Sequence, residues 1–149
     1  WGIILLFGGG FALAAAFSSS GLSNYIGNSL QGLSNIPTFI LVLLICTIIN
    51  FLTELTSNTA TTQMILPILA SVSVAIGINP LLLMIAATLS ASMAFMLPVG
   101  TPPNTIVFAS KRLKIWDMAK TGFALNIISV IVIALLVYFI GSIIFDFTL

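Results

Sequence analysis

The chain has 149 residues, of which 60% are hydrophobic and only 5% are charged, whereas soluble domains carry about 25% charged residues. Its mean hydropathy of +1.28 leaves too little polar surface to cover a soluble globule, so we expect an integral membrane protein. The net charge of +1 says nothing about partners, and because no basic stripe is present we expect no nucleic-acid partner. The single cysteine, Cys46, excludes an internal disulfide framework. The absence of histidine excludes Ser-His-Asp hydrolysis and HExxH zinc sites.

The first third of the chain predicts one membrane helix and one interfacial helix. Residues 1–17 are apolar and predict the end of a membrane helix. A full span needs roughly 20 apolar residues and the chain begins with Trp1, so we expect that the N-terminal part is missing. Residues 18–35 combine Ser, Asn and Gln with Leu and Ile at helical spacing, which predicts an amphipathic helix in the interface. A solvent loop is the alternative, which the glycines of this segment keep open.

Residues 36–78 contain the most polar cluster of the chain between two apolar runs. The cluster is TELTSNTATTQ, residues 53–63, and the runs are 36–52 and 64–78. Irregular backbone is tolerated within hydrocarbon only where protein or a water-lined cavity surrounds it. The cluster is therefore either a surface loop between two spans or the tip of a re-entrant hairpin. The short runs and the lack of Lys or Arg in the cluster favour the hairpin.

Residues 79–112 predict a broken transmembrane helix. Asn79 and Pro80 are a favourable helix start, with Asn as the cap and Pro in the first turn. The motif PVGTPPN, residues 98–104, holds three prolines, which remove backbone donors and push the preceding residues out of the α region. We expect the helix to stop near 98–100 and to restart at Pro102 or Pro103, with Thr101 as its cap.

Most of the charged residues lie in one loop before the last span. This loop carries Lys111, Arg112, Lys114, Asp117 and Lys120. By the positive-inside rule, residues 111–120 are expected in the cytoplasm, with the loop proper at 113–119. The last transmembrane helix is expected within 120–149, with its apolar span at about 123–146. The C-terminus is then extracytoplasmic.

Two helix interruptions in one bundle predict two kinds of binding site. A helix that ends at an interruption presents free carbonyls and a partial negative charge, which suits Na⁺. A helix that begins there presents free N–H groups and a partial positive charge, which suits an anion. Paired, Pro/Gly-interrupted segments of this kind are typical of secondary transporters. A kinked structural helix with a surface loop is the alternative.

At TSNTAT (56–61) and PVGTPPN (98–104) the sequence resembles the divalent anion/sodium symporters, which include the INDY-type sodium-coupled dicarboxylate transporters. The opening WGIILLFGGGFALA is also similar to that family. The resemblance implies an all-α integral membrane fold that forms the C-terminal part of an inverted-repeat transporter. Residues 1–17 then end a scaffold helix, 36–78 form the re-entrant hairpin, and 79–112 form the discontinuous helix. It further implies a missing N-terminal repeat, a homodimer, alternating access, and a place in a bacterial or archaeal cell membrane.

The same resemblance implies a set of site residues and a function. Na⁺, the coupling ion, is expected at the carbonyls of Thr53, Thr56 and Gly100 and the side chain of Asn58. One carboxylate of a di- or tricarboxylate such as succinate is expected at Asn58, Thr59, Thr101 and Pro102. Supporting positions are expected at Ser57, Pro103 and Asn104. These residue types fit, because an Asn amide offers both an acceptor for Na⁺ and a donor for a carboxylate.

Glu54 is the one charged residue of the polar cluster. It is either a counter-charge at the hairpin tip or a proton carrier, and we favour the structural role. Other functions also remain open: a sulfate or other inorganic anion transporter, an Na⁺/H⁺ exchanger-like protein, or a passive channel subunit. We do not expect an enzyme, because Ser57 has no histidine to activate it and the lysines lie in the distant loop.

Overall fold

The structure, a computed structural model, describes residues 1–22, 25 and 36–145. All regular elements within these residues are helical, and no strand occurs among them. They are α1 (Gly2–Ser19), α3 (Thr38–Thr53), α4 (Asn58–Ala75), α5 (Pro80–Ala91), α6 (Pro102–Ala109), α7 (Ile115–Leu135), the π-helical turn η2 (Leu136–Ile140) and α8 (Gly141–Phe145). The interfacial helix expected in 18–35 lies mostly outside the described residues.

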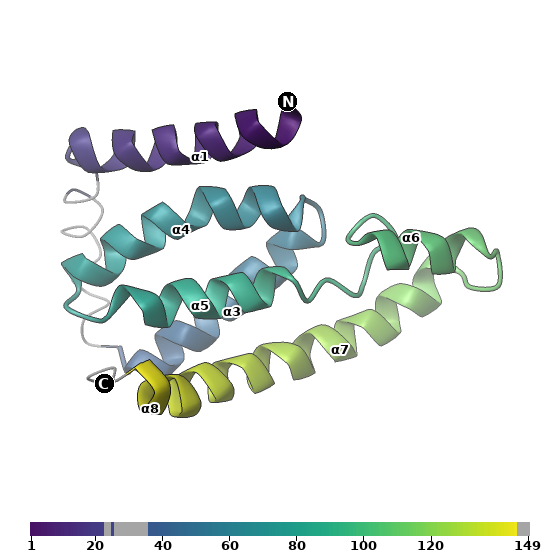
Figure 1. Ribbon diagram of the computed structural model, residues 1–149. Coiled ribbons are helices and arrows are strands. Elements are labelled where there is room, and N and C mark those ends of the chain that lie inside the picture. The colour runs from purple at the N-terminus through teal and green to yellow at the C-terminus, as the bar shows by residue number, and fades with distance from the viewer. Residues whose placement is uncertain (23–24, 26–35, 146–149) are drawn as a thin grey trace.

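Helix α5 occupies the centre of the bundle. It packs against α4 on one side and against α3 and α7 on the other, while α1 lies on the outer face of α4. Figure 1 shows this order, with α6 at one end of the molecule beside the beginning of α7. Helices α3 and α4 form a helical hairpin whose tip, residues 54–57, lies next to the segment that joins α5 to α6.

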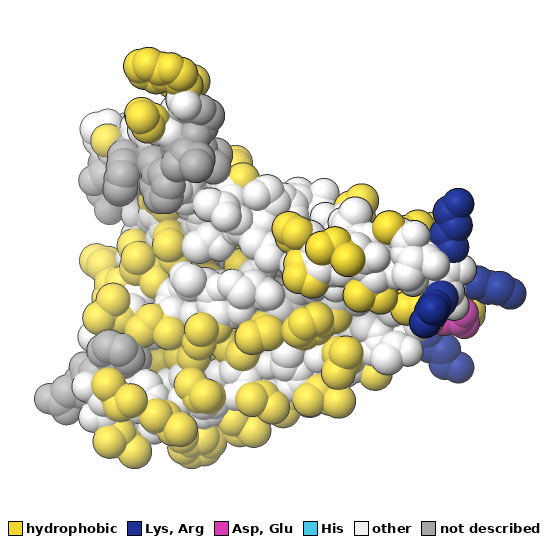
Figure 2. Space-filling model, turned by 45° about the vertical axis from the view of Figure 1, so that its right-hand side comes forward, with side chains coloured by type: hydrophobic (Ala, Val, Ile, Leu, Met, Phe, Trp, Pro, Cys, Tyr) yellow, Lys and Arg dark blue, Asp and Glu magenta, His cyan; other side chains and the backbone are white. Residues whose placement is uncertain are grey.

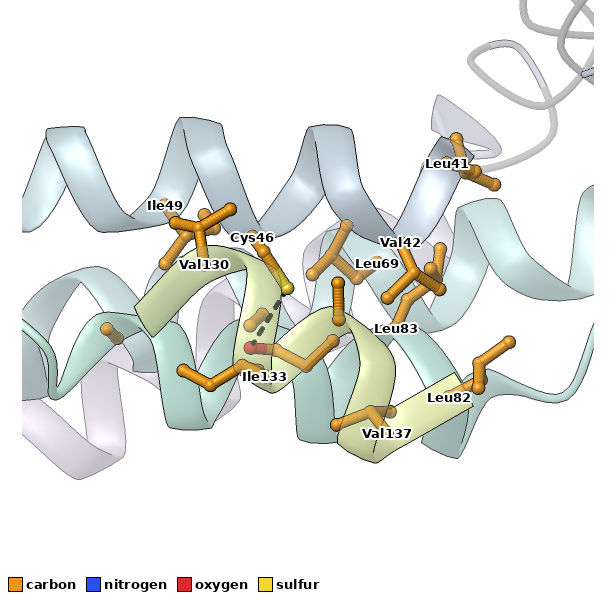
Figure 3. Packing of buried hydrophobic residues seen from close by; sticks show 14 residues of the cluster. Leu41, Val42, Cys46, Ile49, Leu69, Leu82, Leu83, Val130, Ile133 and Val137 are labelled. Atoms are coloured by element: carbon orange, nitrogen blue, oxygen red, sulfur yellow. Dashed lines mark hydrogen bonds between the residues drawn. The ribbon is translucent and has the colours of Figure 1, made fainter. Parts of the chain in front are cut away.

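The buried core lies between α3, α5 and α7. Figure 3 shows the cluster, in which Cys46 of α3 faces α5 and its thiol lies 3.9 Å from the carbonyl oxygen of Ala86. Small side chains on α5 permit this close approach of helices, as is common in membranes. The buried hydrophobic members of the cluster are Leu41, Val42, Cys46, Ile49, Leu69, Leu82, Leu83, Ala86, Ala87, Ala91, Val130, Ile133, Ala134 and Val137.

The turn between α4 and α5 confirms one sequence prediction and adds a detail to it. The side chain of Asn79 accepts a hydrogen bond from the backbone N–H of Leu81 at 3.0 Å, and Pro80 is the first helical residue, as predicted. Immediately before it, Gly77 adopts a φ of +78°. The N–H of Ile78 then reaches the carbonyl of Ser73 at 3.0 Å, which closes the end of α4.

Helix α5 ends earlier than the prolines predict. We expected it to stop near 98–100, but its last helical residue is Ala91. The prolines are therefore not the immediate cause of the break. The N–H groups of Phe95, Met96 and Leu97 bind the side chain of Glu54 instead of helical carbonyls. The carboxylate of Glu54, at the tip between α3 and α4, takes these donors, so no helix continues from Phe95 to the first proline.

Helix α7 begins earlier than expected. Its first residue is Ile115, inside the range 113–119 that was predicted as a loop, and the turn before it contains Lys111 at a φ of +59°. Asp117 lies in the first helical turn, where a negative charge complements the helix dipole. Together α7 and η2 form Ile115–Ile140, the one stretch among the described residues that is long and apolar enough to cross a membrane. The predicted end near 146 lies outside the described residues.

The charged and apolar surfaces are separated. Figure 2 shows Lys and Arg side chains gathered at one end of the molecule and many hydrophobic side chains elsewhere on the visible face, among other side chains and backbone. The four basic residues all lie in 111–120 and are exposed. Large apolar side chains of α7 and η2 are also exposed, including Ile128 and Val132 on α7 and Phe139 on η2. An exposed apolar surface with one charged end is what a bilayer accommodates.

We predict that Gly122→Ala destabilises the protein. Gly122 is the point of closest approach between α7 and the segment after α5, and an added Cβ would overlap the carbonyl oxygen of Phe95 and the Cα of Met96. Overpacking against backbone of this kind costs about 1–3 kcal/mol, which lowers the melting temperature by several degrees. Thermal unfolding of the detergent-solubilised protein measures the change.

Gly8→Ala on α1 is the matched control, because a Cβ there meets nothing within 4 Å. Its melting temperature should be unchanged or slightly higher, since Ala is the better helix former. If Gly122→Ala melts with the control, α7 does not pack against this segment as the structure describes.

Candidate functional site

The hairpin tip brings a helix C-terminus and a helix N-terminus together. Helix α3 ends at Thr53 and α4 begins at Asn58, with Ser57 as its N-cap residue. Ser57 makes no side-chain capping bond, and the first amides of a helix have no intrahelical partner. The hydroxyl of Thr56 is directed away from these amides, to the carbonyl of Leu52 at 2.9 Å and to the hydroxyl of Thr61 at 2.6 Å. The first turn of α4 is therefore left open to a ligand.

The break, residues 92–101, is irregular backbone that side chains of α6 bind. Prolines deprive the carbonyls of this segment of helical partners, as the sequence predicts. The amide of Asn104 donates to the carbonyls of Ala94 at 3.0 Å and Leu97 at 3.1 Å. The hydroxyl of Thr105 donates to the carbonyl of Pro98 at 2.6 Å. Three carbonyls of the break, those of Ala94, Leu97 and Pro98, thus find donors on the helix that follows it.

Glu54 connects the hairpin tip to the break. It is only 3% exposed and accepts hydrogen bonds from the N–H groups of Phe95, Met96 and Leu97 at 2.8, 2.9 and 3.0 Å. The side-chain amide of Asn126 on α7 donates to the same carboxylate at 2.6 Å. One acidic side chain therefore joins α3, the break and α7.

A cavity of about 540 Å³ lies where the tip meets the break. Six of the site residues predicted from the sequence line it, four from the tip and two from the break. They are Thr56, Ser57, Asn58 and Thr59 from the tip and Gly100 and Pro102 from the break, joined by Leu55 and Val99. Two segments about forty positions apart in the sequence thus face one volume.

The other predicted residues lie around this cavity but do not line it. Thr53 is fully buried beneath the tip, and its hydroxyl donates to the carbonyl of Asn50 at 3.0 Å. Thr101 takes the N-cap position of α6 as predicted, but its side chain makes no capping bond, which corrects the expected cap. Pro103 is exposed, and Asn104 is directed to the break.

Asn58 combines a place in the cavity lining with an unpartnered polar atom, a combination that the other unpartnered residues, Asn50, Gln63, Ser73 and Ser90, do not show at this cavity. Its side-chain oxygen Oδ1 is buried and has no hydrogen-bond partner among the described residues. A buried acceptor without a partner costs about 1–3 kcal/mol, so native proteins rarely retain one without a reason. A neutral amide oxygen is a suitable donor for a hard cation such as Na⁺, and the residue lines the cavity.

The beginning of α6 offers fewer amide donors than the sequence argument assumed. Two of its first three residues, Pro102 and Pro103, have no N–H group, so only Asn104 of the three carries one. Helix α6, the second half of the broken helix, therefore contributes to anion binding mainly through its partial positive charge and its shape, and less through hydrogen bonds. The first turn of α4, with Asn58 and Thr59, is the better source of donors for an anion.

Sequence reasoning missed two residues that organise the site. Asn126 binds Glu54, and Asn50 on α3 donates to the carbonyl of Met93 at 2.6 Å; both are fully buried. The available signal was their position, since each is an amide side chain within an otherwise apolar helix. Polar residues inside membrane segments are expensive and mark functional or organising positions.

We predict that Asn104→Asp destabilises the break more than Asn104→Ala does. Alanine removes the donor of the Ala94 carbonyl and one of the two donors of the Leu97 carbonyl, which keeps the N–H of Gly100. A buried carbonyl that loses its partner costs about 1–3 kcal/mol. Aspartate adds acceptor oxygens next to the same two carbonyls and no donor. Thermal unfolding in detergent measures the melting temperature of both variants.

Ser110→Ala, at the exposed end of α6, is the control and should melt like the parent. Equal melting temperatures for all three variants would contradict this description.

Comparisons with known proteins were made with the whole chain. The profile of the family described as the sodium:sulfate symporter transmembrane region matches residues 1–146. The sodium-dependent dicarboxylate transporter SdcS of Staphylococcus saprophyticus is 52% identical over 139 residues, which is 93% of this chain and 27% of that protein. The sodium-dependent dicarboxylate transporter SdcS of Staphylococcus aureus is 52% identical over 144 residues, which is 97% of this chain and 28% of that protein. The chain thus spans little more than a quarter of these relatives, which are transporters and not enzymes.

Proposed function

This chain belongs to the sodium:sulfate symporter family, and from that premise we propose that it supplies one sodium site and one end of the anion site of a sodium-coupled carboxylate symporter. The substrates are di- or tricarboxylates such as succinate. The observation that carries the proposal is the cavity between tip and break, which Asn58 lines, together with the unpartnered side-chain oxygen of that residue. The names of the curated relatives support Na⁺ as the coupling ion and a dicarboxylate as the substrate.

The cation binds on the side where helices end. The carbonyls of Thr53 and Thr56 follow the end of α3, and the carbonyl of Gly100 belongs to the break. The side-chain oxygen of Asn58 completes this set. All four are neutral oxygens, which hold Na⁺ without fixing it permanently, and a helix C-terminus adds a partial negative charge. Thr53 and the side-chain oxygen of Asn58 are buried, which limits competition from water.

The anion binds on the side where helices begin. One substrate carboxylate meets the side chains and first-turn amides of Asn58 and Thr59, with Thr101 and Pro102 closing the site from the break. Moving a carboxylate from water into this site is unfavourable without compensation, and a neighbouring Na⁺ offsets part of that cost. Sodium therefore binds before the substrate, and this order couples the two fluxes.

The hairpin is re-entrant in this proposal, because its tip meets the middle of the last span. Asn126, which binds Glu54 at the tip, lies near the centre of the stretch Ile115–Ile140. Helix α3 has 16 residues, which corresponds to about 24 Å of helix, whereas the hydrocarbon layer is about 30 Å thick. Both values favour a tip within the bilayer over a surface loop.

The remaining parts of the proposal concern the whole transporter. The exposed basic residues in 111–120 support a cytoplasmic position for that end of the molecule, with the C-terminus on the opposite side. The bacterial relatives favour the cell membrane. A second, N-terminal repeat completes the binding site, two copies form a homodimer, and transport proceeds by alternating access.

A second candidate function is transport of sulfate or another inorganic anion. One observation favours it, namely that the description of the matched family names sulfate. Tetrahedral sulfate and the planar carboxylate group of a dicarboxylate would use the same first-turn donors. Competition between the two anions for uptake therefore separates the candidates. A dicarboxylate transporter is inhibited by unlabelled succinate at concentrations where sulfate has no effect.

We predict that Asn58→Ala removes sodium-driven uptake. The assay uses a chimaera in which this chain replaces the matched segment of the Staphylococcus aureus transporter, reconstituted in liposomes with radiolabelled succinate outside. The parent chimaera accumulates succinate only with an inward Na⁺ gradient. In the variant, sodium-driven succinate uptake should fall about tenfold or more, because one side chain binds both the cation and the carboxylate.

Asn79→Ala is the matched control, because the same residue type there caps α5 at the far end of the molecule. It should lose stability by about 1 kcal/mol and retain sodium-driven uptake. Sodium-driven uptake that survives in Asn58→Ala would remove this residue from the site. Uptake by the parent chimaera that is equal in Na⁺ and K⁺ would contradict sodium coupling.

A further inference from the structure

Glu54 is a buried charge whose partners are amides and not cations. Among the described residues its hydrogen-bond partners are three backbone N–H groups and the side chain of Asn126. The four Lys and Arg residues of the chain are all exposed and lie within 111–120. A buried carboxylate without a cation is costly, and such a residue inside a membrane protein is expected to serve its function.

The geometry around the carboxylate explains the shape of the break. One carboxylate oxygen of Glu54 accepts from Phe95 and Met96, and the other accepts from Leu97. Three consecutive N–H groups that converge on one anion form a nest, which is incompatible with a continuing α-helix. Glu54 therefore sets the backbone course from Phe95 to Gly100, the residue whose carbonyl the proposed cation site uses.

Asn126 orients this carboxylate from α7. Its Nδ2 donates to Glu54 at 2.6 Å, while its Oδ1 accepts from the N–H of Phe95 at 3.2 Å. One turn earlier, Gly122 lies against the backbone of Phe95 and Met96. The amide of Asn126 thus bridges the carboxylate and the nest that binds it, on a helix face that fits the break closely.

The carboxylate also lies immediately behind the proposed cation site. A Cβ built on Gly100 would be 3.2 Å from Glu54 Oε2, so the charge is next to the backbone of Gly100. On the chain, Glu54 directly follows Thr53, whose carbonyl belongs to the same proposed site. A cation held by these carbonyls is within the range where an opposite charge acts strongly in a buried environment.

We propose that Glu54 and Asn126 are positioning residues of the cation site: together they hold the break against the hairpin tip, and the charge of Glu54 is balanced by the bound Na⁺. This inference deepens the proposed function and rests on it. Neither side chain contacts the substrate. Their effect is on the affinity for Na⁺, through the placement of carbonyl oxygens and through the field of one fixed negative charge.

Three variants of the chimaera separate the charge from the geometry. Glu54→Gln keeps the side-chain length and removes the charge. Glu54→Asp keeps the charge but is one methylene shorter, so it no longer reaches the nest. Asn126→Ala removes one of the four donors and leaves the carboxylate in place, so it is the mildest change. If the Glu54 variants do not fold, the result for Asn126→Ala decides the test.

Two readouts are used for each variant. The first is the Na⁺ concentration that gives half-maximal succinate uptake, with the KM for succinate measured at saturating Na⁺. The second is the rise in melting temperature that Na⁺ causes relative to K⁺ in purified protein without substrate, which reports cation binding independently of transport. A purely structural defect lowers the melting temperature in both salts and does not change the difference between them.

We expect Glu54→Gln and Glu54→Asp each to raise the half-saturating Na⁺ concentration by about tenfold or more, and Asn126→Ala to raise it about threefold or more. The KM for succinate at saturating Na⁺ should change less than twofold. The stabilisation by Na⁺ should shrink in the same order. Controls are Thr47→Ala on α3 and Ser129→Ala on α7, whose hydroxyls bond only within their own helices, and both should match the parent.

The outcomes separate this inference from the proposed function. Unchanged Na⁺ dependence in Glu54→Gln overturns the charge balance, and unchanged dependence in Glu54→Asp and Asn126→Ala overturns the positioning. If the parent chimaera does not transport but its stabilisation by Na⁺ is lost in these variants, the inference stands and the transport proposal fails. If Na⁺ does not stabilise even the parent, the cation site and this inference are both wrong.

Discussion

The carboxylate of Glu54, bound by three consecutive backbone N–H groups, is the interaction on which the arrangement of the site depends. It stops α5 at Ala91, well before the prolines, and it attaches the released segment to the tip of the hairpin. Through Asn126 it also attaches both to the long helix α7. Without this carboxylate, the hydrogen bonds that hold the tip and the break together would be lost. With it, the tip and the break enclose one cavity in which a helix end and a helix beginning face the same volume.

The local features of the site could be predicted from the sequence because their causes are local. Proline lacks an N–H group, so PVGTPPN interrupts a helix wherever it occurs. The sequence Asn79-Pro80 starts a helix by the chemistry of its own residues, and the structure confirms the capping bond. The polar cluster at 53–63 likewise indicates a turn between two apolar helices. Six of the predicted site residues line the cavity for this reason: they belong to the two interruptions themselves.

The parts that were not predicted depend on contacts between distant residues. Glu54 lies about forty positions before Phe95 and about seventy before Asn126, and no spacing rule relates them. The early end of α5 follows from that contact, so it was placed several residues too late. The same holds for Asn104, whose role as a donor to the break depends on the path that the break takes. Gly122 appears ordinary in the sequence, but only a glycine lets α7 approach the Phe95 carbonyl.

The central claim is that the tip and the break bind a cation and a carboxylate side by side. The most direct measurement is a cryo-electron microscopy map of the chimaera with Na⁺ and succinate, compared with a map in K⁺ without substrate. The account predicts a cation density in contact with the side-chain oxygen of Asn58 and the carbonyl of Gly100, and a carboxylate density at the first turn of α4. Succinate bound away from this cavity, with no density between Asn58 and Gly100 that depends on Na⁺, would contradict it.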